Sequence, residues 1–390
     1  MPFPRSPLAA ASPLFLAALA AFCAPAHAAG EVDMTADRWQ ANGTLSFAID
    51  AAHPHGVMTV TAGGAILKGV TFGSGTIEYD IEQLADNQGI EGIWFRQQGS
   101  ESAENFYLRT ESDCPSSIEC LQYAPVSHGQ VQWEVYPQYE AGAPVHATGW
   151  NHVRLVISGQ RMNVFVNGQA QPALQVEQLA GDAAAGAIQL RGDARFANLR
   201  VLPDVVDGLA RRAPPDPSDA DAGLVRHWQV SPVSTLARGS APGVDAMPPA
   251  TAAWEPLDAE RGGFVNLARG HGTARGTPDL AWLKTTIVSD RVQTKHVALA
   301  MGHEVWVWVG GQLVFADRNL YYPASARKPP LGRVALENGS FELPLAAGAN
   351  EVVVAVSNDL GSKQHWGWGL AMRLADVVGV RLKAAAPAGM

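Results

Sequence analysis

Apolar and polar residues alternate along most of this chain, and the clearest alternation lies in WNHVRLVISGQRMNVFVNG, from Trp150 to Gly168. A period of two predicts strands that have two unlike faces. Ser158-Gly159-Gln160 separates the two runs and predicts a tight turn, because glycine tolerates a positive φ. The stretch therefore predicts a β-hairpin.

The same pattern recurs between Asp37 and about Pro203, and helical periodicity is nearly absent there. In GTIEYDIEQL, for example, Ile77, Tyr79 and Ile81 face one way and the acidic residues between them face the other. About a dozen short strands with frequent turns are typical of a β-sandwich. We expect this sandwich to span 35–203, with strands at 44–50, 57–63, 65–70, 75–84, 89–98, 104–111, 131–136, 186–192 and 194–203.

A second alternating region follows at 224–383, and its clearest hairpin is EVWVWVGGQLVFADRN at 304–319. The segment 204–223 between the two regions is dominated by Pro, Asp and Ala and has no apolar period, so we expect an extended linker. The tail 384–390 is expected to be disordered. The predicted fold class is all-β, with two β-sandwich (jelly-roll) domains joined by a Pro/Asp-rich linker.

The N-terminus has the features of a secretory signal peptide. Arg5 precedes an apolar run at 8–22, and Ala26-His27-Ala28 is a small-x-small cleavage site, which assigns 1–28 to the signal. No later apolar run approaches the roughly 20 residues that a membrane-spanning helix needs. We therefore expect a protein that is periplasmic or secreted and does not span the membrane.

Cleavage of the signal would leave two cysteines, Cys114 and Cys120. An even count in an oxidising compartment predicts one disulfide, and two free thiols are the alternative. The bridge would close the short loop CPSSIEC, so its main role would be to fix the shape of that loop.

The charge balance argues against a nucleic-acid partner. The chain has 28 Lys and Arg against 37 Asp and Glu, a net charge of −9, whereas phosphate binding needs clustered basic residues. The chain also has 11 Trp residues. Exposed Trp is a common surface for stacking on sugars, although buried Trp is the more frequent case.

The order of the motifs carries a family resemblance. GTIEYDIE, GIWFR, the hairpin that begins Trp-Asn and ends Asn-Gly, and GAIQLRGDARFANLRV follow one another as in concanavalin A-like, laminin-G-like jelly rolls. More narrowly, residues 35 to 203 resemble the keto-disaccharide hydrolase-type domain of exported bacterial proteins. The second region, with VWVGGQ, Leu345 to Glu351 and its closing WGWGLAMRL strand, resembles a galactose-binding-like domain.

Sugar binding on such folds needs aromatic faces together with amides, carboxylates and Arg that hydrogen-bond hydroxyl groups. In the first domain, Arg96 is in phase with Trp94, and four residues alternate on the next strand. The ligand-binding candidates there are Arg96, Asn105, Tyr107, Arg109 and Glu111. The alternative is that Arg109 pairs with Glu111 or a neighbouring carboxylate on a solvated sheet.

Aromatic residues near loops give the candidates of the second domain. In galactose-binding-like folds the sugar usually lies at loop ends, so the resemblance implies a site at Tyr321, Tyr322, Trp366 and Trp368. The alternative is a loop that is capped by its own aromatic residues.

Catalytic signatures are weak. Glycoside hydrolysis needs a pair of carboxylates at a defined separation. Glu78, Asp80 and Glu82 form E-x-D-x-E, which is not the E-x-D-x-x-E of laminarinase-type enzymes. In the resembled family, the strand after GI-x-FR carries Glu and Gln at alternating positions, where this chain has Tyr107 and Arg109.

His53 and His55 lack the further ligands that a Zn²⁺ site requires, so we expect no metal centre and no cofactor, with a structural Ca²⁺ left open. The leading hypothesis is an exported protein of the cell envelope that binds a carbohydrate ligand. A hydrolase or lyase acting on glycosides or keto-disaccharides, with the first domain catalytic, is the alternative. A module that binds no sugar is the second alternative, because fold alone does not fix function. Whether the chain is an enzyme stays open.

Overall fold

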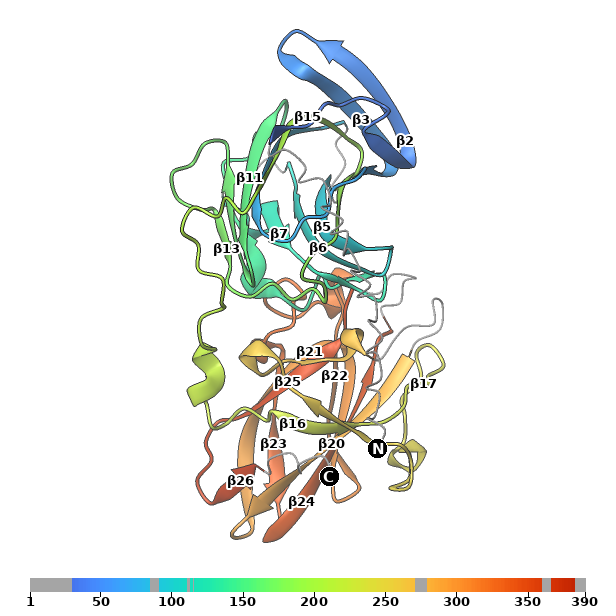
Figure 1. The fold of residues 1–390 in the computed structure, drawn as a ribbon. Helices are drawn as coiled ribbons and strands as arrows, with labels where there is room; N and C mark the ends of the chain where they lie inside the picture. The colour runs from blue at the N-terminus through green and yellow to red at the C-terminus, as the bar shows by residue number, and fades with distance from the viewer. Residues whose placement is uncertain are drawn as a thin grey trace, which may run out of the picture.

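The computed structural model describes residues 30–84, 91–110, 113–114, 116–270, 279–359 and 366–382. These residues form two β-sandwich units that follow one another along the chain (Figure 1). The predicted all-β class is confirmed: the described part contains strands and short 3-10 helices and no α-helix. None of these helices is long and apolar enough to cross a membrane.

The first unit is built from one continuous strand path, β10-β7-β6-β5-β14-β3-β15-β4-β11-β12-β13. Its strands are β1 (Gly30–Glu31), β2 (Trp39–Asp50), β3 (His53–Leu67), β4 (Gly75–Gln83), β5 (Glu91–Gln98), β6 (Ser102–Leu108), β7 (Leu121–Tyr123), β8 (Val126–Ser127), β9 (Gln130–Val131), β10 (Glu140–Ala141), β11 (Asn151–Ser158), β12 (Arg161–Val166), β13 (Leu174–Val176), β14 (Ala187–Arg191) and β15 (Ala194–Pro203).

The second unit follows the path β18-β16-β20-β24-β21-β25-β19. Its strands are β16 (His227–Val230), β17 (Ser234–Thr235), β18 (Glu255–Asp258), β19 (Val265–Asn266), β20 (Asp279–Ser289), β21 (Gln293–Val309), β22 (Gln312–Asn319), β23 (Gly339–Leu345), β24 (Gly348–Ser357), β25 (Gly369–Leu374) and β26 (Val380–Leu382).

Short 3-10 helices occur in the connections of both units. They are η1 (Ile118–Cys120), η2 (Pro137–Tyr139), η3 (Pro217–Ala220), η4 (Val244–Ala246), η5 (Arg261–Gly263), η6 (Leu267–Arg269), η7 (Ala324–Ala326) and η8 (Leu336–Asn338). Several of them lie where the two units meet, so they shape the contact described below.

The alternation of the sequence places the first core. Ile77, Tyr79 and Ile81 on β4 are fully buried, as are Val153 and Leu155 on the neighbouring β11. Burying an apolar side chain of this size stabilises the fold by roughly 1.5–3 kcal/mol. The strand path curls so that the apolar faces of both arms enclose this one core.

The second unit uses its central strand in the same way. Val305 and Val307 on β21 join the main core, and Trp306 and Trp308 pack on the opposite face in a smaller cluster with Trp282. Both tryptophans of the VWVWV motif are therefore buried, one on each side of Val307 along the strand. The two expected hairpins are both present, as β11–β12 and β21–β22.

One expectation about local structure differs from what is observed. The segment 131–136 is not one strand, because only Val131 belongs to β9 and the main chain of Glu134 bonds to Trp366 and Val334 of the second unit. The connection at 204–223 contacts both units. Arg211 accepts a hydrogen bond from the Gln160 backbone, and Asp221 pairs with Arg373 at 2.6 Å. The connection is therefore docked along both units.

Candidate functional site

One face of the first unit, turned away from its core, carries polar side chains in two cross-strand rows. The first row runs from β2 to β6 through five directly paired residues: Gln40, Ile66, Gln189, Trp94 and Asn105. The second row is parallel to it and runs from β2 to β10: Asn42, Gly64, Arg191, Gly92, Tyr107, Gln122 and Glu140. We call these two rows the amide face.

Glycines flank Arg191 on both neighbouring strands of the second row. A Cβ at Gly92 would lie 2.2 Å from the Phe106 carbonyl oxygen, and one at Gly64 would lie 2.3 Å from Nε2 of Gln189. Both approaches are closer than a side chain tolerates, so these positions favour glycine. Neither directly paired neighbour therefore adds a side chain beside Arg191, and the Gln189 amide lies next to Gly64.

One end of the amide face is open. A cavity of about 350 Å³ lies there and is lined by Gln40, Ala41, Asn42, Ile66, Trp94, Gln97, Gly99, Ser100, Ala187 and Arg191. The guanidinium of Arg191 lies 3.8 Å from the centroid of the Trp94 ring. This is a cation–π contact, in which the ring face attracts the cation.

Arg191 has no hydrogen-bond or ion-pair partner within the described part of the chain. Burial lowers the pKa of its guanidinium, with no neighbouring carboxylate to oppose that shift. Uncompensated polar groups also surround it. Both amide atoms of Gln189 lack a partner, as do Oε1 of Gln97 and Nδ2 of Asn105, and all four atoms are buried. Unpartnered buried amides are uncommon in proteins.

The other end of the amide face is closed by the second unit. Arg333 is only 1% exposed and pairs with Glu140 at 2.5 Å and with Glu119 at 3.0 Å. Its guanidinium lies 3.8 Å from the centroid of the Trp133 ring. Figure 1 shows β6 and β7 on the side of the first unit that meets the second.

Tyr107 and Arg109, two predicted ligand-binding residues, belong to this closed end. Tyr107 donates a hydrogen bond to Gln122, and Arg109 donates to the Tyr107 hydroxyl at 3.2 Å and to the Glu119 carbonyl at 2.5 Å. Burial raises the pKa of the Tyr107 hydroxyl well above its usual value. Their polar groups are thus engaged within the protein, and neither lines the open cavity.

Arg96 does not lie on the same face of the sheet as Trp94, although its spacing in the sequence predicts that it does. Its backbone has a φ of 52°, and the β5–β6 register shifts between Phe95 and Gln98. This bulge turns the side chain to the core side, where it donates to the carbonyls of Gly73 and Gly159. Glu104 is 3.7 Å from the same guanidinium. Arg96 is therefore separated from Tyr107 and Arg109 by the sheet.

The remaining candidates of the first unit have mixed outcomes. Asn105 shares the amide face with Trp94 but is only 2% exposed. Glu111 lies outside the described residues, as does the expected signal peptide at 1–28. Cys114 and Cys120 form a disulfide with Cα atoms 6.0 Å apart. The loop that it closes contains Glu119, the partner of Arg333.

Two of the four second-unit candidates, Tyr321 and Trp366, meet the first unit at Trp133, and Tyr322 packs on them. The Tyr321 and Trp366 rings lie 4.5 and 5.0 Å from the Trp133 ring, and Tyr322 packs on Tyr321 at 4.6 Å. Tyr322 is 56% exposed. Trp368 is fully buried in the second core, so its ring faces are not open to a ligand.

Carboxylates are scarce at the open end. Glu78, Asp80 and Glu82 lie on β4 and pair with Arg200, His152 and Arg195 at 2.6 to 2.9 Å. These cross-strand pairs occupy the E-x-D-x-E motif. No Asp or Glu is among the described residues that line the open cavity.

Glu91 is the carboxylate with the clearest perturbation near this sheet. It begins β5, is 1% exposed, and accepts a hydrogen bond from Gln83 at 2.7 Å. Burial raises the pKa of its carboxyl to about 7, and Asp193 adds to that shift. Glu91 faces Leu108 across the β5–β6 pair, on the core side and not on the amide face.

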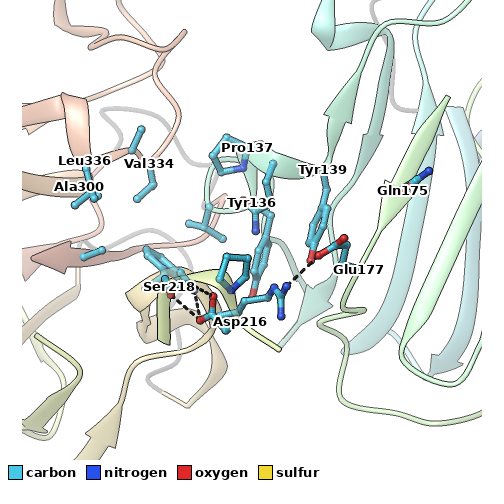
Figure 2. Close-up of a pocket in the computed structure, with 18 residues that line it drawn as sticks. Tyr136, Pro137, Tyr139, Gln175, Glu177, Asp216, Ser218, Ala300, Val334 and Leu336 are labelled. Carbon is cyan, nitrogen blue, oxygen red and sulfur yellow. Dashed lines mark hydrogen bonds and ion pairs between the residues drawn. The ribbon is translucent and has the colours of Figure 1, made fainter. Parts of the chain in front are cut away.

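A larger cavity of about 620 Å³ lies between the two units. It is lined by Val135, Tyr136, Pro137, Gln138, Tyr139, Gln175, Glu177, Asp216, Pro217, Ser218, Arg261, Gly262, Phe264, Ala300, Val334, Ala335, Leu336 and Ala371. Figure 2 shows Ala300, Val334 and Leu336 on one side of the space and Tyr139 and Glu177 on the other.

The charged and phenolic groups of this interdomain cavity already have partners. Arg261 pairs with Glu177 at 3.0 Å, Asp216 accepts from Ser218 at 2.7 Å, and the Tyr139 hydroxyl accepts from the Gln178 backbone. Its remaining walls are mainly apolar. The open end of the amide face therefore offers more unsatisfied polar chemistry than the larger cavity does.

Among the described residues, no group of three or more His, Cys, Asp and Glu side chains is arranged to hold a metal ion. His53 and His55 instead pair with acidic residues, Asp50 in one case and Glu31 and Asp33 in the other.

Sequence reasoning did not single out Arg191, Gln189 or Gln97. The motif GAIQLRG does contain a usable signal, since Gln189 and Arg191 alternate with apolar Ile188 and Leu190 and so share one face. Which neighbouring strands flank that face depends on the β3-β14-β5 order, and sequence alternation carries no information on strand order.

Among solved structures, several sugar-related modules resemble this chain at low similarity. A carbohydrate-binding module from Bacillus subtilis is 14% identical with a TM-score of 0.32, over 42% of this chain and 93% of that one. Domain 4 of an extracellular arabinanase from Geobacillus stearothermophilus is 11% identical with a TM-score of 0.26, over 41% and 77%. At such low similarity neither likeness assigns an activity.

Other solved structures match over most of this chain. One of them, an exo-β-1,3-galactanase from Phanerochaete chrysosporium, is 12% identical with a TM-score of 0.21, over 82% of this chain and 78% of that one. No curated protein matches the chain. The galactose-binding-like resemblance of the second unit stays a prediction.

The first unit is also matched by a protein-family model. The match covers residues 30–202, close to the 35–203 that the motif order predicts. It confirms the resemblance stated for the first unit: residues 30–202 match the 3-keto-alpha-glucoside-1,2-lyase-like domain family.

Proposed function

We propose that the protein binds a carbohydrate at the open end of the amide face. The observation that carries the proposal is the cavity beside Trp94, where an aromatic ring, an arginine and several amides meet without a carboxylate. Amides exchange hydrogen bonds with hydroxyl groups, and Trp94, which is only 9% exposed, holds the Arg191 guanidinium over its ring at the edge of the cavity. The family match of the first unit supports a sugar as the ligand class.

Binding without turnover fits this cavity better than hydrolysis does. An acid–base pair of carboxylates is the usual requirement for cleaving a glycosidic bond. The described residues that line the cavity supply none. The unpartnered Oε1 of Gln97, which lines the cavity, would instead find a hydrogen-bond partner in a sugar hydroxyl, which removes the cost of leaving it unsatisfied.

A glycan array probed with the purified protein tests this proposal. Asn42 is exposed on β2 and lines the cavity, so Asn42→Trp should block the cavity without disturbing the core. Ser46→Trp is the matched control, because Ser46 is exposed on the same strand outside the cavity lining. We expect array signals that Asn42→Trp removes and Ser46→Trp retains. No signal for any glycan would leave the non-sugar interaction module as the remaining reading.

A second candidate function is the processing of a keto-disaccharide or glycoside. The description of the matched family favours it. Glu91 is the acid–base group to test, because its carboxyl pKa of about 7 suits proton transfer near neutral pH, although the carboxyl lies on the core side of the sheet. A turnover assay with 3-keto-disaccharides tests this alternative. Turnover by the wild type that is lost in Glu91→Gln and unchanged in Glu337→Gln, an exposed control, would replace the binding-only proposal.

We further propose that the chain is exported to the periplasm or beyond. The apolar N-terminal run and the disulfide between Cys114 and Cys120 both support an oxidising compartment. Cell fractionation with N-terminal sequencing tests the proposal. It predicts an exported product that begins near Ala29, and a full-length product retained in the cytoplasm would contradict it.

A further inference from the structure

Arg191 differs from Arg333 and Arg96 in having no carboxylate beside it among the described residues. Arg333 has two carboxylate partners, and Arg96 has Glu104 and two backbone carbonyls. The guanidinium of Arg191 lies over the Trp94 ring and has no hydrogen bond or ion pair among the described residues. A partly buried cation without a partner costs free energy, and an incoming anion would recover it.

The surroundings of Arg191 are arranged to leave its donors free. Trp94 covers one face of the planar guanidinium, and such stacking uses the face while the N–H groups point out from the edge. Gly64 and Gly92 occupy the directly paired positions on the two neighbouring strands, so neither of these two residues adds a side chain of its own beside Arg191. A planar guanidinium presents two parallel donors that match a carboxylate.

Neutral hydrogen-bonding side chains also line this cavity, beside apolar residues such as Ile66 and Ala187. Oε1 of Gln97 is an acceptor without a partner, and Gln40 and Asn42 add exposed amides on β2. Gln189, paired beside Trp94 in the neighbouring row, has both amide atoms buried and unpartnered. The cavity therefore combines one free cation with several amides, which is complementary to one carboxylate among several hydroxyl groups.

We propose that this cavity recognises acidic sugars, with Arg191 binding the carboxylate of a uronic acid unit and the surrounding amides binding its hydroxyl groups. This inference rests on the proposed carbohydrate-binding function and names its substrate class. Sulfate esters are also anionic, but the flat two-donor edge of Arg191 matches a planar carboxylate, so the uronate is the form to which the proposal commits.

An array of oligomers of galacturonate, glucuronate, mannuronate and guluronate tests the inference. Each oligomer is printed beside its carboxyl-reduced counterpart, which keeps the ring and loses the charge, and sulfated and neutral glycans complete the array. We expect at least one uronate oligomer to bind roughly 10 to 100 times more tightly than its reduced counterpart, as a charge-assisted pair would give.

Two variants test whether Arg191 causes the tighter binding of the uronate oligomer. Arg191→Gln should remove the difference between the uronate and its reduced counterpart, and circular dichroism checks that the variant is folded. Arg212→Gln is the matched control, because Arg212 is exposed in the connection and has no ion pair among the described residues. It should leave the difference unchanged.

The other outcomes separate this inference from the proposed function. Equal binding of uronate and reduced oligomers, unaffected by Arg191→Gln, would overturn the acidic-sugar inference and leave the sugar-binding function standing. Binding of sulfated glycans alone would overturn the commitment to a carboxylate. Absence of binding to every glycan would sink both proposals.

Discussion

Two arginines lie on tryptophan rings at the two ends of the same polar face, each with its guanidinium 3.8 Å from a ring centroid. At the closed end, Arg333 of the second unit stacks on Trp133 and pairs with Glu119 and Glu140. At the open end, Arg191 stacks on Trp94 beside a cavity and has no carboxylate partner among the described residues. The two arginine–tryptophan distances are equal. The charge of Arg333 is matched by two carboxylates, whereas that of Arg191 is matched by none among the described residues.

The difference indicates what each end does. A buried cation that is matched by carboxylates within the protein holds structure together, and breaking such a set leaves an uncompensated charge. A cation without a partner contributes little to stability and is available to a ligand. The same face of one sheet thus serves as a docking surface for the second unit at one end and as a candidate site at the other.

The largest effect is expected from Arg333→Met. This change leaves Glu140, whose side chain is fully buried, without its cation, and should lower the free energy of unfolding by roughly 3–5 kcal/mol. Chemical denaturation measures it. Adding Glu140→Gln should restore much of the loss, because the buried charge is then gone. If Arg333→Met alone lowers the free energy of unfolding by less than about 1 kcal/mol, the ion pair between Arg333 and Glu140 does not hold the two units together.

Glu91 is the acidic counterpart of Arg191, a buried charge without an ion-pair partner in the described part. Its folded pKa of about 7 lies above the usual 4.5, so the folded state holds a proton that the unfolded state releases between these pH values. Stability should therefore fall as pH rises from about 4.5 to 7. Glu91→Gln should raise the free energy of unfolding by roughly 2 kcal/mol at pH 8 and change it little at pH 4.

Urea denaturation of Glu91→Gln at both pH values gives the measurement. Glu337→Gln, at an exposed position in η8, is the control that should show no such pH dependence. A variant that gains equally at pH 4 and pH 8 would show that the carboxyl of Glu91 does not carry the pH dependence.

The closed end also depends on the loop that presents Glu119. The disulfide between Cys114 and Cys120 spans a sequence separation of 6, and a loop this short gives roughly 2 kcal/mol of chain-entropy stabilisation. Replacing both cysteines by serine should lower stability by about that amount. If the Arg333→Met loss is unchanged in this background, then the loop does not position Glu119 for Arg333, and the disulfide acts on the loop alone.

The smallest effect on stability is expected at the open end. Arg191→Met removes an unpaired cation and a cation–π contact worth about 0.5–1 kcal/mol, so the net change should stay within about 1 kcal/mol. Thermal and urea unfolding measure it. A decrease in the free energy of unfolding as large as that of Arg333→Met would show that Arg191 stabilises the fold as Arg333 does, which would contradict the difference proposed between the two ends.

The sequence predicts the framework of this molecule well, because alternation reports directly on burial in a strand. Ile77, Tyr79 and Ile81 are buried as their spacing predicts, and both Val-rich hairpins form. The site is less predictable. The φ of 52° at Arg96 turns this side chain away from the face that its spacing with Trp94 predicts, and alternation does not report such a bulge.

Contacts between the units explain the other differences. Tyr107 and Arg109 have the right phase for the amide face, but Arg333, more than 200 positions later, closes that end. Trp133 and Glu134 look like part of a strand, but Glu134 bonds through its main chain to Trp366 and Val334. Such pairings between residues far apart in the chain leave no local pattern in the sequence.

The most direct test of the account is a crystal structure of the protein soaked with the uronate oligomer that binds best on the array. We expect the sugar at the open end of the amide face, with its carboxylate within hydrogen-bond distance of Arg191 and a ring close to Trp94. A sugar bound instead in the interdomain cavity between Tyr139 and Val334, with Arg191 still unpartnered, would contradict it.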